Sequence, residues 1–106
     1  MKIIAESASN HNGDINYLKR LAQASKNSGA DYFTFQMFDP ESFCASDYER
    51  FDIVASIAIP QSEWAELIKH CREIDIKMIP CALDIKSFHF CLSQNLDFFK
   101  IHATDI

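Results

Sequence analysis

The alternation of strand-like and helix-like patterns most constrains what this chain can fold into. Short runs rich in aromatic and β-branched residues predict four strands, near residues 2–7, 31–37, 77–82 and 97–102. Segments with helical periodicity separate them. Such alternation predicts an α/β fold with a parallel sheet and right-handed crossovers. The pattern by itself fits a doubly wound sheet and a barrel equally well.

Three segments between the strands carry the spacing of amphipathic helices. Asp14 can cap the first, and Gly29 stands where a helix end favours a left-handed residue. Asp84 can cap the third. The apolar positions expected to face the core are Ile15, Leu18, Leu21, Ala22, Trp64, Leu67, Ile68, Cys71, Phe88, Cys91 and Leu92.

The segment 38–60 is too long for an ordinary connection between a strand and a helix, so it is expected to be functional or irregular. The pair Asp39-Pro40 marks a turn. Ser46 followed by Glu49 fits a capping box, which predicts a short helix over 47–55.

Composition excludes several classes of function. The net charge is −5 with no cluster of Lys and Arg, which argues against nucleic acid and anionic membranes as partners. No apolar run approaches the roughly 18 residues of a membrane span, and the first residues lack a signal-peptide pattern. A cytoplasmic location is therefore expected. The four cysteines form no C-x-x-C pair, so we expect reduced thiols in the core.

Polar residues gather at the carboxyl ends of the predicted strands, where parallel α/β folds bind ligands. They are Glu6 after the first strand, the loop Asn10-His11-Asn12-Gly13, Thr34 and Gln36 on one face of the second strand, and Lys100, His102 and Asp105 at the fourth. A carboxylate, an amide, an imidazole and an ammonium group are thus expected to converge on one end of the sheet.

Each of these residues also has a purely structural interpretation. Glu6 and Lys100 could form a buried ion pair, but such pairs stabilise a fold less than apolar packing does. A functional role is therefore the favoured interpretation for both. His11 follows a strand and precedes a helix, so ligand contact and loop capping are both open.

The motifs occur in the order of a known family. They are Ile4-Ala-Glu6, Asn10-His-Asn-Gly13, Ser28-Gly-Ala-Asp31, Phe35-Gln36, and Phe99-Lys-Ile101 with Thr104-Asp105. Together they resemble the opening of the N-acetylneuraminate (sialic acid) synthase family. The resemblance covers nearly all of this chain and less than half of a family member. It implies the N-terminal half, strands 1–4, of a (β/α)8 TIM barrel, with residues 1–106 forming a single partial domain.

The resemblance also implies an activity. Family members condense phosphoenolpyruvate with an N-acylated amino sugar, such as N-acetylmannosamine, to give a nonulosonic acid. A divalent metal, Mn²⁺ or Mg²⁺, activates the sugar aldehyde, and its histidine ligands come from the later half of the barrel. We therefore expect no metal ligand in this chain, no activity of the chain alone, and a homo-oligomer for the protein.

Individual residues carry over from the resemblance. Glu6 and Gln36 match residues that hold the sugar, Lys100 matches a lysine that binds phosphoenolpyruvate, and Asp105 matches an acidic residue near the attacking water. The resemblance thus implies Glu6 and Asp105 as catalytic residues. It implies Asn10, His11, Gln36 and Lys100 as substrate-binding residues.

The chain departs from the family pattern on three strands, and on the third the residues Pro80-Cys-Ala-Leu83 replace all four residues of a Ser-Thr-Pro-Phe motif. Thr34 replaces a lysine, Cys81 a threonine, and His102 and Ala103 a small residue and a serine. Because the lysine, threonine and serine resemble anion contacts, weak binding of phosphoenolpyruvate is expected. Two alternatives to a condensing enzyme stay open: a relative that binds a sugar without condensing it, and a half-barrel that serves as an assembly unit.

Overall fold

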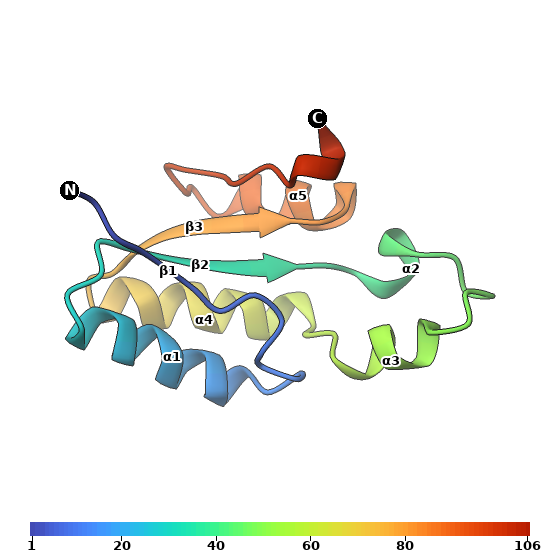
Figure 1. Ribbon diagram of the computed structural model, residues 1–106, viewed down its shortest axis with the longest axis horizontal. Helices are drawn as coiled ribbons and strands as arrows, with labels where there is room; N and C mark the ends of the chain where they lie inside the picture. Colours follow the sequence, from blue (N-terminus) through green and yellow to red (C-terminus); the bar gives the residue numbers. More distant parts are fainter.

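The alternating patterns form a parallel sheet flanked by helices in the computed structural model, which describes residues 1–106 (Figure 1). Its elements are β1 (Ile4–Glu6), α1 (Ile15–Asn27), β2 (Tyr32–Met37), α2 (Pro40–Phe43), α3 (Phe51–Ser56), α4 (Gln61–Glu73), β3 (Lys77–Ala82), α5 (Ile85–Ser93) and the 3₁₀ turn η1 (Ala103–Asp105). None of these helices has the length and apolar character that crossing a membrane requires.

The sheet has the order β1-β2-β3, and both neighbouring pairs are parallel. Glu6 lies beside Thr34, and Thr34 lies beside Ile79. The first three predicted strands, their order and their direction are therefore confirmed. The carboxyl ends of β2 and β3 point toward α2 and α3, which extend beyond that end of the sheet (Figure 1).

The prediction of a fourth strand over 97–102 is wrong. The segment runs beside β3 in the parallel direction, but it forms only a single bridge between Cys81 and Lys100. Pro80 gives the physical reason. Its carbonyl accepts from the Lys100 N–H at 2.9 Å, so its nitrogen faces the same neighbour and has no hydrogen to donate. The ladder therefore loses a bond where a longer pairing would continue.

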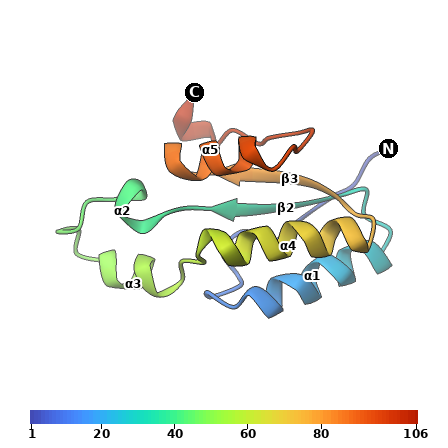
Figure 2. The same cartoon turned by 180° about the vertical axis from the view of Figure 1, so that it is seen from behind.

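The main core lies between the sheet and the helices α1 and α4, which run side by side along one face (Figures 1 and 2). Phe33 and Phe35 of β2 point into it, and Trp64 of α4 stacks on Phe35 with ring centroids 5.4 Å apart. Leu18 and Leu67 are fully buried there. Since side chains alternate along a strand, Thr34 and Gln36 face the opposite side, as the sequence predicts.

The segment 38–60 differs from its prediction. Its first helix, α2, begins directly after Asp39, whose carboxylate accepts from the Ser42 N–H. The second, α3, starts at Phe51, and no side chain caps it. The predicted capping box at Ser46 is therefore wrong, because residues 46–50 form turns instead of a helical first turn. The sequence pattern alone could not show where the short helices begin, because few residues of this segment are buried.

The inward face predicted for α5 is only partly confirmed. Cys91 is fully buried beside Met37, with the two sulfur atoms 3.4 Å apart. Phe88 and Leu92 are more than a third exposed, and so is Ile85 at the start of the helix. α5 packs on β3, and the Phe88 ring contacts Phe99 of the fourth segment with centroids 5.8 Å apart, while Ile85 and Leu92 remain exposed.

Candidate functional site

The face of the sheet opposite α1 and α4 carries an open pocket of about 410 Å³, which we call the open-face pocket. Its lining residues come from all three strands and from the fourth segment: Ile4, Glu6, Thr34, Ile79, Phe99 and Lys100. This volume lies within the range of small-molecule sites. The sequence singled out Glu6, Thr34 and Lys100, but it missed the apolar walls. Alternation along β1 and β3 is the signal that places Ile4 and Ile79 on this face.

Glu6 and Lys100 meet across the open-face pocket. Glu6 ends β1 at one edge of the sheet, and Lys100 lies in the segment at the other edge. The Lys100 Nζ donates to Glu6 Oε1 at 2.9 Å, and the two side chains are 42% and 39% exposed, Glu6 first. The structure therefore joins two residues that are 94 positions apart. Because both remain accessible, the pair is no buried structural bridge.

Thr34 and Gln36 complete the polar part of this face. The Thr34 side chain is almost fully buried, and its Oγ1 has no hydrogen-bond partner. A buried hydroxyl without a partner costs about 1–3 kcal/mol. The oxygen has almost no exposed surface, so a ligand reaches it only if neighbouring atoms move. Gln36 Oε1 accepts from the Ser9 hydroxyl at 3.2 Å, which ties the loop after β1 to β2.

Lys100 also lines a second hollow of about 360 Å³ at the end of the fourth segment, together with Asp84, Asp105 and mainly apolar residues. Asp105 is exposed in η1. His102 Nδ1 lies 2.8 Å from the Thr104 hydroxyl oxygen and caps η1, while Ala103 is exposed. Of the predicted residues of the fourth segment, Lys100 thus lines both hollows and Asp105 lines the second, whereas His102 and Ala103 line neither.

His11 does not lie on the open face. The side chain is 2% exposed, its Nδ1 accepts from the Gly13 N–H at 3.0 Å, and its ring packs edge-on against Trp64. Burial lowers the pKa of His11, so the imidazole is neutral near pH 7 and suits this acceptor role. This contact is the loop capping that the sequence left open beside ligand contact, and the role of His11 as a substrate ligand stays a prediction. Asn10 remains exposed in the same loop.

Gly13 allows a direct test of how tightly this loop is packed. Its φ is +81°, and a Cβ there would lie 3.1 Å from the Ser56 carbonyl oxygen. Gly29 has a similar φ of +84° but open space around it. We expect Gly29→Ala to lower the free energy of unfolding by about 1 kcal/mol through backbone strain. Gly13→Ala should lower it further, because Ser56 must also move.

Urea denaturation of both variants measures the difference. Equal losses for the two glycines would show that the loop does not pack tightly against the end of α3.

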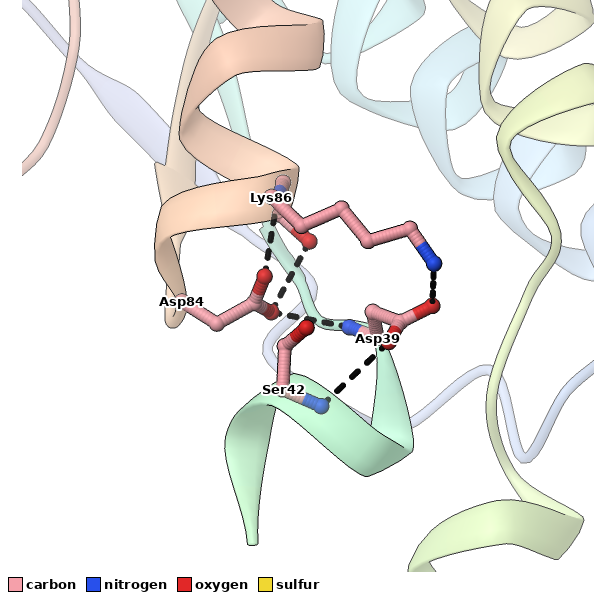
Figure 3. Close-up of polar contacts among 5 residues, drawn as sticks. Asp39, Ser42, Asp84 and Lys86 are labelled. Carbon is pink, nitrogen blue, oxygen red and sulfur yellow. Dashed lines mark hydrogen bonds and ion pairs between the residues drawn. The ribbon is translucent and has the colours of Figure 1, made fainter.

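A polar cluster connects the ends of β2 and β3 next to the second hollow, which Asp84 also lines (Figure 3). Asp84 Oδ2 accepts from the Asp39 N–H at 2.8 Å, and Asp84 also accepts from the Ser87 N–H and hydroxyl. Lys86 Nζ donates to Asp39 at 2.6 Å, which lowers the pKa of Asp39 and raises the pKa of Lys86. The side chains of this cluster satisfy one another, so we assign it a structural role.

The cysteines are free thiols. Burial raises the pKa of Cys71 and of Cys91 to about 12, and it also raises the pKa of Cys81. These thiols therefore stay protonated near pH 7 and make poor nucleophiles or metal ligands.

No group of three or more His, Cys, Asp or Glu side chains in the chain is arranged to hold a metal ion.

Comparison with known proteins gives consistent matches. A family model described as the NeuB family matches residues 21–106. The chain is 35% identical to the uncharacterized protein MJ1065 of Methanocaldococcus jannaschii, over 98% of this chain and 31% of that protein. It is 29% identical to an N,N'-diacetyllegionaminic acid synthase of Campylobacter jejuni, over 98% of this chain and 35% of that one. The chain therefore spans about a third of the length of these relatives.

Solved structures match the fold. An N-acetylneuraminic acid synthetase from Leptospira borgpetersenii superposes with a TM-score of 0.83 at 22% identity, over 93% of this chain and 35% of that chain. A spore coat polysaccharide biosynthesis protein from Bacillus subtilis superposes with a TM-score of 0.71 at 30% identity, over 94% and 28%. The strands and helices described above thus correspond to about a third of such chains.

Proposed function

Because this chain belongs to the NeuB family, we propose that it forms the N-terminal part of a synthase that condenses phosphoenolpyruvate with an N-acylated amino sugar. The observation that carries the proposal is the contact between Glu6 and Lys100 over the open-face pocket. A carboxylate and an ammonium group at the carboxyl ends of parallel strands suit the binding of a polar substrate.

We assign a separate role in binding or catalysis to each residue of the site. Glu6 and Gln36 hold sugar hydroxyl groups, and the accessible Lys100 ammonium attracts the anionic substrate. Asp105 lies near Lys100, where it can orient the attacking water. The walls formed by Ile4 and Ile79 exclude water from one side of the reacting carbons.

A divalent metal and further substrate contacts belong to the part of a NeuB protein that this chain does not span. A bound Mn²⁺ or Mg²⁺ would polarise the sugar aldehyde. Asp39 and Asp84 do not supply a site for the metal, because their carboxylate oxygens already accept hydrogen bonds from backbone N–H groups and from Lys86. We propose that its ligands lie outside residues 1–106.

The first test joins this chain to the remaining two thirds of the Campylobacter legionaminic acid synthase, in place of the matching third. We expect the chimera to release phosphate from phosphoenolpyruvate and to form a nonulosonic acid, both measured with the amino sugar and Mn²⁺ present. The 106-residue chain alone should give no turnover.

A matched pair of variants controls this test. Lys100→Ala should lower the kcat/KM of the chimera for phosphoenolpyruvate by about a hundredfold, since it removes a charge-assisted contact of roughly 1.5–3 kcal/mol. Lys19→Ala removes a similar ion pair with Glu66 on the helix side and should change nothing. A folded chimera without turnover would contradict the proposal, and so would turnover by the chain alone.

A second candidate, a relative that binds a sugar without condensing it, is favoured by one observation. Thr34, which stands where the family pattern has a lysine, lines the pocket with a neutral side chain. Sugar binding by a chimera that shows no phosphoenolpyruvate turnover would support this candidate instead.

A further inference from the structure

The open-face pocket contains only two charged side chains, Glu6 and Lys100. Its other lining residues are apolar or, in the case of Thr34, neutral. The formal charge of the lining is therefore zero. The neighbouring hollow contains Lys100 with Asp84 and Asp105, and its formal charge is −1. Lys100 is thus the single cation that either hollow can offer to an anion.

In the structure the Lys100 ammonium group already forms an ion pair. The Glu6 carboxylate accepts from Lys100 Nζ at 2.9 Å, at the place where an anionic ligand would receive the same hydrogen bond. A carboxylate and a phosphate oxygen are equivalent acceptors for an ammonium group. Glu6 thus has the chemistry and the position of a bound anion.

The pair is also easily opened. Both side chains are about 40% exposed, so water and solutes reach them from the pocket. Ion pairs at this exposure are weak and screened by salt. Once Glu6 moves away, Lys100 keeps its charge and is free to donate to another acceptor in the pocket.

We propose that Glu6 is an internal competitor for phosphate-bearing ligands at Lys100. Its carboxylate holds the pocket in an uncharged state that a neutral hydroxylated ligand enters freely, whereas a phosphate group must first displace Glu6. The inference deepens the proposed function, on which its relevance to phosphoenolpyruvate rests. The competition itself depends only on the side chains of this chain.

The test compares phosphate binding by the unaltered chain and by Glu6→Gln, followed by titration calorimetry and NMR. Glutamine keeps the shape of the side chain but removes its negative charge. We expect Glu6→Gln to bind inorganic phosphate about tenfold more tightly, because the amide is a weaker acceptor for Lys100 than the carboxylate and does not repel the phosphate. The gain should disappear in the double variant Glu6→Gln with Lys100→Gln.

A matched control comes from the helix side of the molecule. Glu66→Gln frees Lys19 from an ion pair of 3.1 Å outside the pocket, with the same change in net charge. It should leave phosphate affinity unchanged. An equal gain for Glu66→Gln would show that the effect comes from net charge alone and would overturn the proposal. A gain that persists in the double variant without Lys100 would overturn it as well.

A measurement on the unaltered chain keeps the proposal testable if Glu6→Gln does not fold. Added phosphate should shift the NMR signal of the Glu6 side-chain carboxyl carbon as Lys100 exchanges its partner. Saturation with phosphate that leaves this signal in place would overturn the proposal. None of these measurements involves turnover, so their failure is distinct from an inactive chimera.

Discussion

Replacing Trp64 by alanine should lower the free energy of unfolding by about 3–5 kcal/mol, the range for a large aromatic side chain in a core. Trp64 is 2% exposed and contacts both Phe35 and His11. Its loss therefore opens a cavity between the sheet and α4 and removes the packing of the loop after β1. Domains of this size have a total stability of about 5–15 kcal/mol, so the variant should be close to unfolded.

Urea denaturation followed by circular dichroism measures this change. The matched control is Leu92→Ala on α5, where the leucine is 49% exposed and a loss of about 1 kcal/mol or less is expected. Similar losses for both variants would show that the core is not centred between α4 and the sheet.

Restoring the anion contacts that the family resemblance implies should produce the largest change in binding. We expect the triple variant Thr34→Lys, Cys81→Thr and Ala103→Ser to bind phosphoenolpyruvate about a thousandfold more tightly than the unaltered chain. One charge-assisted and two neutral hydrogen bonds sum to roughly 4–5 kcal/mol, which sets the upper bound of the gain. The structure places Thr34 and Cys81 on the same sheet face as Glu6 and close to Lys100.

Titration with phosphoenolpyruvate at several salt concentrations measures the gain. A control with Ser93→Lys, an exposed position on α5, adds the same charge away from the pocket and should bind weakly. Tight binding by the unaltered chain would mean that other residues, His102 among them, supply the anion site, and the interpretation of the substitutions would be wrong.

The sequence alone determined the helices and strands that depend on residues close together in the chain. The periodicity of Trp64, Leu67 and Ile68 matches the buried face of α4, and Asp14 caps α1 by accepting from two backbone N–H groups. Alternation along β2 placed Phe33 and Phe35 on the core side. These features follow from the spacing of apolar side chains and from the first turn of a helix, both of which a short window of residues contains.

Other features depend on contacts between distant segments, and only the tertiary structure decided them. Pro80 limits the pairing of the fourth segment because it has no N–H to donate on the side where its carbonyl accepts from Lys100, a relation that no local pattern records. The His11 ring turned toward Trp64, 53 positions later in the chain, because burial against an aromatic core offered more contact than the open face.

The candidate site shows the same division. Residue type and strand position were enough to select Glu6 and Lys100, since polar side chains at the carboxyl ends of parallel strands are unusual unless they bind something. Their direct contact, and the unpartnered hydroxyl of Thr34 beside it, arise from how the edges of the sheet approach each other. That approach is a property of the packed sheet and helices, because strand geometry along one segment does not specify which distant side chains meet.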